Sequence, residues 1–315
     1  MPTAVKTSRV RRQPGRPLPP LKRAPKIEAP SSLRTVRGLQ ILELAPLKKI
    51  PWLVHGFSTR TGGASTLPSG ERVLNLGFTA WDTREAVQKN RQALQAALGA
   101  DDLTLVPLQQ FHSAVIRYFE ASPVEPCRGD AALTNQPGLL LAVQTADCVP
   151  IVLVDPKKRA VAAIHAGWRG TLARITEKTL GQMRMCFGSK PSDVIAAVGP
   201  SIGGCCYEVG IELVTKFTSQ FPDAQEWFDE LRTGDEPNPL QWLNMMPPGH
   251  QPPPRNVRLD LRKANRAQLL SSGLAGKNIY LSDLCTSCHT DLLFSYRKEA
   301  DRSGRLMAVA GIKSS

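Results

Sequence analysis

Residues 138–171 constrain the fold more than any other part of the chain. An apolar run precedes Thr145-Ala146-Asp147-Cys148, a second run covers 149–154 and a third covers 160–164. Short apolar runs bounded by Pro and charged residues are typical of strands. A turn at 155–158 therefore predicts a hairpin between 149–154 and 160–165. Such a hairpin brings Cys148 and His165 to one edge, where they can hold one metal ion or act as a nucleophile and its base.

The remaining pattern predicts an α+β fold. Short predicted strands outnumber predicted helices, and the helices are not regularly interleaved with them, which favours mixed β-sheets packed together with helices outside. A chain of 315 residues with 42% hydrophobic residues can bury a sizeable core. We predict strands at 34–44, 52–60, 103–108, 114–119, 194–198, 279–281 and 306–312, and a Gly-rich loop at 61–65. Helices are predicted at 83–98, at 171–187, at 259–270 and in a segment that follows the Gly-rich turn at 199–209 and ends at residue 217.

The net charge of +13 is concentrated at the beginning of the chain. Eight basic residues and several prolines lie in residues 1–27, and no acidic residue precedes Glu28. We expect residues 1–33 to be a disordered, basic, Pro-rich tail, with an organelle-targeting segment as the alternative. Residues 34–315 are expected to form a catalytic domain with a Pro-rich insertion at about 222–256.

The cysteine count and the hydropathy limit the surroundings of the protein. The seven cysteines are an odd number spread over a long chain, which favours free thiols in a reducing compartment. No apolar run approaches the roughly 18–20 residues of a membrane span. We expect a cytoplasmic protein without a membrane or a specific nucleic-acid partner. The mild positive charge outside the tail suits a small anionic substrate, and the oligomeric state is not predicted.

Two of the five histidines stand out by their placement. His112 and His165 each lie at a predicted strand–loop junction, and with Cys148 they make a set of two imidazoles and one thiolate. Zinc binds such sets tetrahedrally, and three protein ligands with one open position are the pattern of catalytic zinc. A Cys148–His165 nucleophile–base pair and purely structural roles remain open at this point.

Two further motifs are less specific. The Gly62-Gly63 pair beside Arg60 offers amides and a guanidinium to a phosphate, but a plain turn explains it equally well. Cys285-Thr286-Ser287-Cys288-His289 matches the haem c attachment pattern, which needs export. A structural zinc site with Cys205 and Cys206 is an alternative, but the adjacent pair fits a tetrahedron poorly. Buried or site-lining thiols are the favoured interpretation.

Motifs over about 50–312 resemble one family in content and order. The chain is similar to the purine nucleoside phosphorylase family formerly labelled multicopper polyphenol oxidoreductase laccases, also known as laccase-domain or peptidoglycan editing factor proteins. Phe111 and Ser113 depart from the residues that often flank the first histidine in this family. The matching motifs are GFSTRTGGAS at 56–65, NLG at 75–77, QFHS at 110–113, TADCVP at 145–150, HAGWRG at 165–170, GP at 199–200, YEV at 207–209, LDL at 259–261, CT at 285–286 and FSYR at 294–297.

The resemblance implies a fold and a set of site residues. It implies a single domain of αββα layers and a catalytic zinc, with copper as a possible substitute in vitro, bound by His112, Cys148 and His165. Asp147 is expected to act as an acid or base, or else as a carboxylate that orients a histidine. Substrate contacts are expected from Arg60, Asn75, Gln110, Cys285 and Arg297.

The function implied by the resemblance is phosphorolysis of adenosine-, inosine- or guanosine-type nucleosides to base and ribose 1-phosphate. Adenosine deamination by a metal-bound hydroxide is expected beside it, and purine nucleosides and phosphate are the expected partners. A laccase needs a trinuclear copper cluster that consumes many histidines, and five cannot supply it. Two alternatives remain: a cysteine hydrolase that edits peptidoglycan precursors, with Cys148 as nucleophile and His165 as base, and a basic-tailed interaction module.

Overall fold

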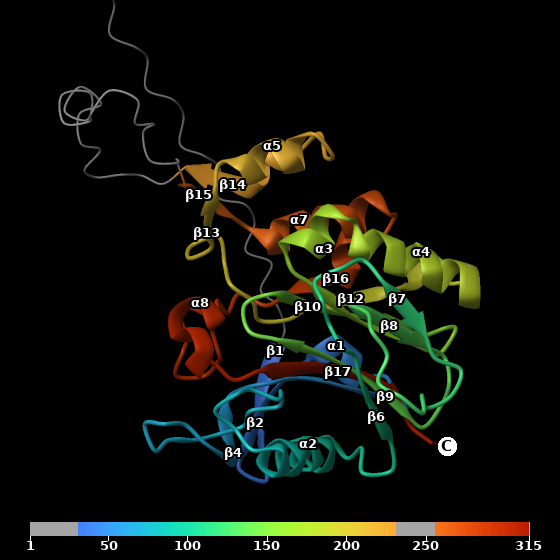
Figure 1. Cartoon of the computed structure of the whole chain (residues 1–315). Helices are drawn as coiled ribbons and strands as arrows, with labels where there is room; N and C mark the ends of the chain where they lie inside the picture. The colour runs from blue at the N-terminus through green and yellow to red at the C-terminus, as the bar shows by residue number, and fades with distance from the viewer. Residues whose placement is uncertain (1–30, 231–255, 315) are drawn as a thin grey trace, which may run out of the picture.

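The computed structural model of the chain describes residues 31–230 and 256–314, and two six-stranded mixed sheets form its centre (Figure 1). The first sheet has the order β1-β2-β3-β17-β9-β6, and the second has the order β16-β12-β10-β11-β8-β7. The strands of the first sheet are β1 Ser31–Val36, β2 Leu39–Leu44, β3 Leu53–Ser58, β17 Leu306–Ile312, β9 Leu139–Thr145 and β6 Thr104–Pro107. Those of the second are β16 Ile279–Leu281, β12 Ile195–Val198, β10 Val149–Asp155, β11 Ala160–Ala166, β8 Ala131–Thr134 and β7 Ile116–Tyr118.

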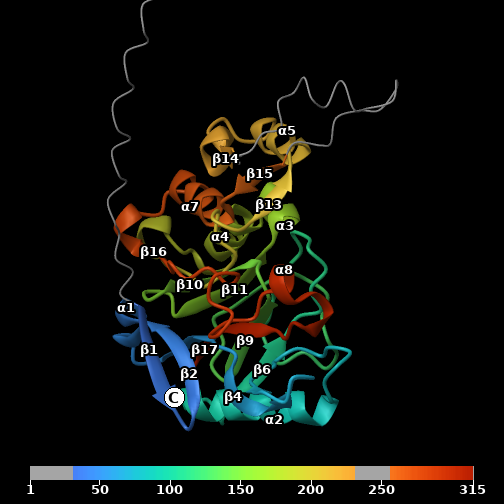
Figure 2. The same ribbon diagram turned by 90° about the vertical axis from the view of Figure 1, so that its left-hand side faces the viewer.

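Helices cover the outer faces of both sheets, so the molecule has αββα layers (Figures 1 and 2). One outer layer is α2 Arg84–Leu98, which packs Leu94 and Ala97 on the first sheet. The opposite layer packs on the second sheet and contains α3 Trp168–Leu172, α4 Ile175–Phe187 and α7 Leu261–Ser271. The predicted α+β class and layer arrangement are therefore confirmed.

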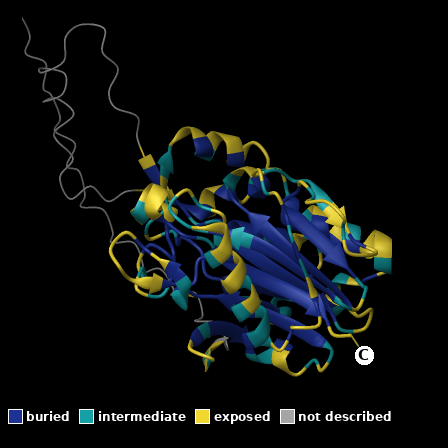
Figure 3. Ribbon diagram, turned by 60° about the horizontal axis from the view of Figure 1, so that its bottom comes forward, coloured by how far each residue is buried: buried dark blue, intermediate teal, exposed yellow. Residues whose placement is uncertain are grey.

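Alternation along the central strands explains the two-sided burial. In β10, Ile151 and Leu153 face the helices, whereas Val152 and Val154 face the first sheet. Because both faces of β10 are covered, its sequence is a continuous apolar run and does not alternate between apolar and polar residues. Figure 3 shows these strands as a buried centre beneath helices that expose one side.

Smaller elements complete the described chain. A three-stranded sheet with α5 lies beyond the helical layer (Figure 2). The remaining elements are α1 Ala45–Lys48, β4 Thr61–Thr66, β5 Arg72–Val73, β13 Glu208–Gly210, α5 Glu212–Thr218, β14 Phe228–Glu230, β15 Asn256–Leu259, α8 Tyr296–Glu299 and the 3₁₀ turns Pro191–Asp193, Ala224–Trp227, Gly276–Asn278 and Ala300–Arg302.

Three local predictions were wrong. The strand expected at 34–44 is two paired strands, because the chain turns back through residues 37 and 38, which both have positive φ. The loop expected at 61–65 is the strand β4. The helix expected at 171–187 is interrupted at Arg174, whose φ of 61° lies in the left-handed region and whose guanidinium bonds Glu177 and the carbonyl of Gln220.

Two predicted segments lie mainly outside the described residues. Of the predicted basic tail at 1–33, only residues 31–33 are described, and they begin β1. Of the predicted insertion at 222–256, only residues 222–230 and 256 are described. Among the described residues, none of the helices combines the length and apolar character required to cross a membrane.

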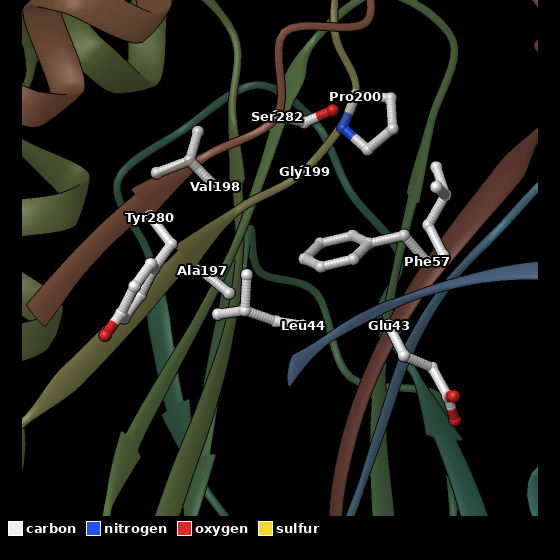
Figure 4. A pocket seen from close by; sticks show the side chains of 10 residues that line it. Glu43, Leu44, Phe57, Ala197, Val198, Gly199, Pro200, Tyr280 and Ser282 are labelled. Carbon is white, nitrogen blue, oxygen red and sulfur yellow. The ribbon is translucent and has the colours of Figure 1, made fainter. Parts of the chain in front are cut away.

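A small gap between the two sheets illustrates why one glycine is required. The gap has a volume of about 20 Å³ and lies between β2–β3 and β12–β16. Figure 4 shows the Phe57 ring pointing towards the backbone of Gly199, where any side chain would collide with the ring. This close approach fixes the distance between the sheets next to the loop that follows β12.

His55 gives the fold a dependence on pH. Its Nε2 accepts a hydrogen bond of 3.1 Å from the Leu44 amide at the start of α1. Burial lowers the pKa of His55 from its usual 6.5 to about 4, despite Glu43, which also pairs with Arg34 and Lys48. The unfolded chain therefore binds the proton more tightly, so stability is complete above pH 6.5 and is lost as the pH falls towards 4.

We expect the unfolding free energy to fall by about 2 kcal/mol between about pH 7.5 and pH 5 because of this residue. Urea denaturation at both pH values measures it. A His55→Gln variant keeps a hydrogen-bond acceptor for the Leu44 amide but has no titratable group at this position. The fall in its unfolding free energy between the two pH values should therefore be smaller than that of the wild type by about 2 kcal/mol. An equal loss in both proteins would contradict the assignment.

Candidate metal centre and cavity

The predicted hairpin brings Cys148 and His165 together. β10 and β11 pair antiparallel with Pro150 opposite His165, and Cys148 precedes β10 directly. The loop between β6 and β7 adds His112. The ligand atoms of His112, Cys148 and His165 all lie within 4.8 Å of one another, and the two imidazole rings meet edge to face with centroids 4.9 Å apart.

Asp130, at the start of β8, holds two of these residues in place. Its buried carboxylate accepts hydrogen bonds from the backbone amides of Phe111, His112 and Ser113 and from the Ser113 hydroxyl. The His112 loop consequently wraps around one carboxylate, with His112 at a φ of 60°. Asp130 Oδ1 also lies 2.8 Å from His165 Nδ1.

The charges in this cluster support one another. Burial opposes ionisation of Cys148, but His165 and His112 together lower the pKa of its thiol to about 6. Burial also opposes protonation of His165, but Cys148 and Asp130 raise its pKa to about 9. The pKa of Asp130 falls to about 2, because hydrogen bonds from His165 and Ser113 outweigh its burial. The site thus stabilises a thiolate next to positive charge.

The side chains fit a metal ion. With Nδ1 bonded to Asp130, the Nε2 lone pair of His165 is free to bind a cation, which is the usual arrangement for a histidine ligand. Gly167 leaves room for the set, since a Cβ there would lie 3.0 Å from Cys148 Sγ and 3.1 Å from His112 Cδ2. A metal would replace the imidazolium as the partner of the thiolate, with three protein ligands and an open position.

A cavity of about 730 Å³ opens in front of this cluster. Its wall carries three guanidinium groups and three large aromatic side chains in addition to the candidate ligands. The lining residues are Leu108, Gln110, His112, Gln144, Ala146, Asp147, Cys148, His165, Trp168, Arg169, Tyr207, Tyr296, Arg297, Asp301 and Arg305.

Asp147 uses its carboxylate to hold the cavity wall. Oδ1 accepts hydrogen bonds from the hydroxyls of Thr286 and Ser295 at 2.6 and 2.8 Å, and Oδ2 accepts one from the Arg297 amide at 2.6 Å. Its φ of 93° is strained for a residue with a side chain. These contacts make Asp147 an anchor for residues 286–297.

Two of the five expected substrate contacts lie on the cavity. Gln110 lines it, but its side-chain amide also pairs at both ends with the backbone of Gln144, each at 2.7 Å. Arg297 lines it too, with its guanidinium bonded to the Glu208 carbonyl at 2.8 Å and 5.2 Å from the centre of the Tyr207 ring.

Arg60 lies outside the cavity lining. Its buried guanidinium bonds Glu299 and the Thr290 carbonyl, each at 2.7 Å, and stacks over the Phe294 ring. The neighbouring Gly63 is packed against Asn90, with a hypothetical Cβ only 2.7 Å from its Oδ1. Arg60 and this glycine therefore tie β4 to adjacent elements.

Asn75 and Cys285 also lie behind the cavity wall. Asn75 is fully buried and accepts a hydrogen bond of 2.9 Å from the backbone amide of Arg305, so it positions an arginine that does line the cavity. The Cys285 sulfur accepts a hydrogen bond from Gly203. Burial opposes its ionisation, but the Gly203 and Cys288 amides lower the pKa of Cys285 to about 7.

Several residues that hold or line the site were not predicted from the sequence, among them Asp130, Arg169, Tyr207 and Arg305. Arg169 lies in the HAGWRG motif that contains the candidate ligand His165, and Tyr207 directly follows the Cys205-Cys206 pair. Asp130 and Arg305 carried no such signal, because only the pairing of distant strands brings them to the cluster.

Comparisons with known proteins agree with this architecture. The family described as multi-copper polyphenol oxidoreductase laccase matches residues 54–313. A purine nucleoside phosphorylase of Deinococcus radiodurans is 38% identical over 280 residues, covering 88% of this chain and 95% of that protein. The purine nucleoside phosphorylase YlmD of Geobacillus stearothermophilus is 34% identical over 271 residues, covering 82% and 89%.

Solved structures have the same fold. A hypothetical protein YfiH from Bacillus licheniformis superposes with a TM-score of 0.76 at 28% identity, covering 90% of this chain and 99% of that one. YlmD from Geobacillus stearothermophilus superposes with a TM-score of 0.72 at 31% identity, covering 90% and 100%.

Proposed function

The chain belongs to the family described as multi-copper polyphenol oxidoreductase laccases, and we propose that it is a zinc-dependent purine nucleoside phosphorylase that also deaminates adenosine. Relatives of similar length carry the name purine nucleoside phosphorylase. The observation that carries the proposal is the cavity in which His112, Cys148 and His165 lie with three arginines and three aromatic side chains. The proposed partners are therefore phosphate and a purine nucleoside.

The arginines supply the phosphate site. Arg169, Arg297 and Arg305 line the cavity, and guanidinium groups match phosphate oxygens with paired hydrogen bonds. The backbone amides of Arg297 and Arg305 donate hydrogen bonds to the side chains of Asp147 and Asn75, respectively. This support fixes the groups that would place a phosphate oxygen next to the anomeric carbon.

The aromatic side chains supply the base site. Trp168, Tyr207 and Tyr296 line the cavity and offer flat surfaces on which a purine can stack. In phosphorolysis the glycosidic bond breaks with its electron pair moving to the base, which takes up a proton. A phosphate oxygen forms the new bond to the anomeric carbon, so base and ribose 1-phosphate are the products.

His112, Cys148 and His165 are the proposed zinc ligands. When bound, zinc would act as a Lewis acid on the oxygen nucleophile in the cavity, which is phosphate in phosphorolysis and, in deamination, the water that replaces the exocyclic amine of adenosine. The laccase reaction is not proposed. His55 is buried in the core and His289 bonds the Cys285 carbonyl, so neither can complete a copper cluster with the two candidate ligands, and His250 lies outside the described residues.

Chromatography of reactions with adenosine, inosine or guanosine and phosphate tests the proposal. The expected products are the purine bases and ribose 1-phosphate, with inosine or hypoxanthine additionally formed from adenosine. If protein that contains zinc forms none of these products, the proposed function is refuted, whereas the proposed metal site is not.

Arg305→Gln is expected to raise the KM for phosphate by roughly 10- to 100-fold, because a charge-assisted hydrogen bond contributes about 1.5–3 kcal/mol. Arg302→Gln is the matched control, since that arginine is exposed and does not line the cavity. Steady-state kinetics with varied phosphate measures both. Equal KM values in the two variants would exclude Arg305 from the phosphate site.

Asp147→Asn separates anchoring from acid–base catalysis. The amide can still accept from Thr286 and Ser295 but places an NH₂ group against the Arg297 amide. We expect kcat/KM to fall about tenfold, mainly through KM, with an unchanged pH profile. A loss in kcat of about 10²–10⁴ and a missing limb of the pH profile would instead identify an acid or base.

One observation favours a second function. The low pKa of Cys148 and its contact with His165 also suit a cysteine hydrolase, with Cys148 as nucleophile and His165 as base. Peptidoglycan precursors are the proposed substrates in that case. Activity on them that survives complete removal of metal by a chelator would favour the hydrolase, and loss restored by zinc would exclude it.

A further inference from the structure

A second group of cysteines lies outside the proposed catalytic cluster. Cys205 and Cys206 follow β12, and Cys285 and Cys288 follow β16. These strands are parallel neighbours, so both loops leave the same edge of the sheet. A bridge between Ser201 and Cys285 extends the pairing beyond the strands.

The sulfur atoms have the spacing of a tetrahedral metal site. All four lie within 4.8 Å of one another. The Cys288 sulfur lies 3.7 Å from that of Cys205 and 3.4 Å from that of Cys206. Four sulfurs at about 2.3 Å from one zinc ion are about 3.8 Å apart along the edges of the tetrahedron. The adjacent pair, which looked unfavourable in the sequence, therefore fits once the loop is folded.

The backbone around the cluster is arranged to support thiolates. The Gly203 amide donates to the Cys285 sulfur at 3.2 Å. The amides of Cys288 and His289 both donate to the Cys285 carbonyl, which closes a tight turn between the two cysteines of the C-x-x-C pair. Hydrogen bonds from backbone amides to sulfur are the kind of outer contact that orients metal ligands.

A positive charge lies next to the cluster. A Cβ at Gly203 would be 2.8 Å from the Arg262 guanidinium and 3.1 Å from the Cys205 sulfur, so both groups approach the same side of this glycine. Four thiolates and one zinc ion carry two net negative charges, which Arg262 offsets only in part because its guanidinium also lies 3.7 Å from the Asp260 carboxylate. Cys285 is buried and Cys205 and Cys288 are exposed, so the site is anchored in the protein and reachable by a metal ion.

We propose that Cys205, Cys206, Cys285 and Cys288 bind a second zinc ion in a closed site with four thiolate ligands. Binding releases the thiol protons to solvent and involves no oxidation. Four protein ligands leave no position for substrate, which distinguishes this structural site from the open set at Cys148.

The second zinc joins two segments that build the cavity wall. Tyr207 follows Cys206 directly and lines the cavity. Thr286 follows Cys285 directly and donates a hydrogen bond to Asp147. The Arg297 guanidinium, in turn, bonds the carbonyl of Glu208. The second zinc site therefore fixes the positions of Tyr207 and Arg297 in the cavity wall relative to each other.

Metal analysis of the full-length protein, purified without a metal-chelating tag, tests this proposal. We expect about two zinc ions per chain in the wild type and about one in the Cys205→Ser/Cys288→Ser double variant, which removes the two exposed ligands. Cys186→Ser is the control, because this exposed thiol belongs to neither cluster. An unchanged zinc content in the double variant overturns the proposal.

A second measurement does not depend on folding of the double variant. In Cys148→Ala protein, X-ray absorption at the zinc edge should find one zinc surrounded by four sulfurs at about 2.3 Å. Protein without zinc, zinc with nitrogen or oxygen ligands, or a disulfide among the four cysteines detected by mass spectrometry overturns the proposal. Both measurements read the metal itself, so failure of the proposed nucleoside activity leaves their outcome unaffected.

Discussion

Cys148→Ala protein is expected to lose about one zinc ion per chain and to lower kcat/KM for phosphorolysis and deamination by about three orders of magnitude or more. The thiolate is the only anionic ligand of the proposed set, and its removal leaves two neutral imidazoles with too little charge to retain the metal. Elemental analysis and product chromatography measure the two effects. Cys186→Ala, an exposed cysteine away from the cavity, should change neither.

The same variant distinguishes the two enzyme hypotheses. If Cys148 binds zinc, chelator treatment of the wild type should reproduce the defect, and added zinc should restore the wild type but not the variant. If Cys148 is instead a nucleophile, the wild type should keep its activity after chelation. Turnover retained by Cys148→Ala would exclude both roles for this thiol.

Asp130→Asn is expected to weaken zinc binding at this site by about 10- to 100-fold. The carboxylate bonds His165 Nδ1 and the amides that shape the His112 loop, so an amide in its place opposes one of these donors with its own NH₂ group. Competition with a chromophoric chelator measures the affinity of the catalytic set in protein that lacks the Cys205 and Cys288 thiols.

A buried aspartate elsewhere provides the control for this prediction. Asp155 is also fully buried and accepts hydrogen bonds from the Lys157 and Lys158 amides in the β10–β11 turn, away from the cavity lining. Asp155→Asn should lower stability without lowering zinc affinity. An equal effect of both substitutions on zinc binding would mean that Asp130 acts only through general stability.

The parts of the fold that could be predicted are those with strong local patterns. The 149–165 hairpin followed from two apolar runs around a charged turn, and α2 followed from its Thr83 cap and the Gly99 stop. The 61–65 segment was misassigned because adjacent glycines indicate a turn, whereas here Gly63 allows close packing on Asn90. This contact between distant residues leaves no local signal.

The candidate site divides in the same way. His112, Cys148 and His165 could be selected because few histidines exist and each stood at a predicted strand–loop junction, although His112 in fact lies in the middle of the β6–β7 loop. Arg60 was expected at phosphate because of its position in a motif, but Glu299 occupies its guanidinium. Arg305 gave no signal because its place at the cavity depends on β17 lying next to β9 in the finished sheet.

Cleavage of inosine by the purified protein, with and without phosphate, tests whether the cavity at the Cys148 site carries out zinc-dependent phosphorolysis. We expect hypoxanthine and ribose 1-phosphate in equal amounts, formed only when phosphate is present and lost on removal of zinc by a chelator. Hypoxanthine released at the same rate without phosphate, or no cleavage by protein that carries zinc at the Cys148 site, would contradict it.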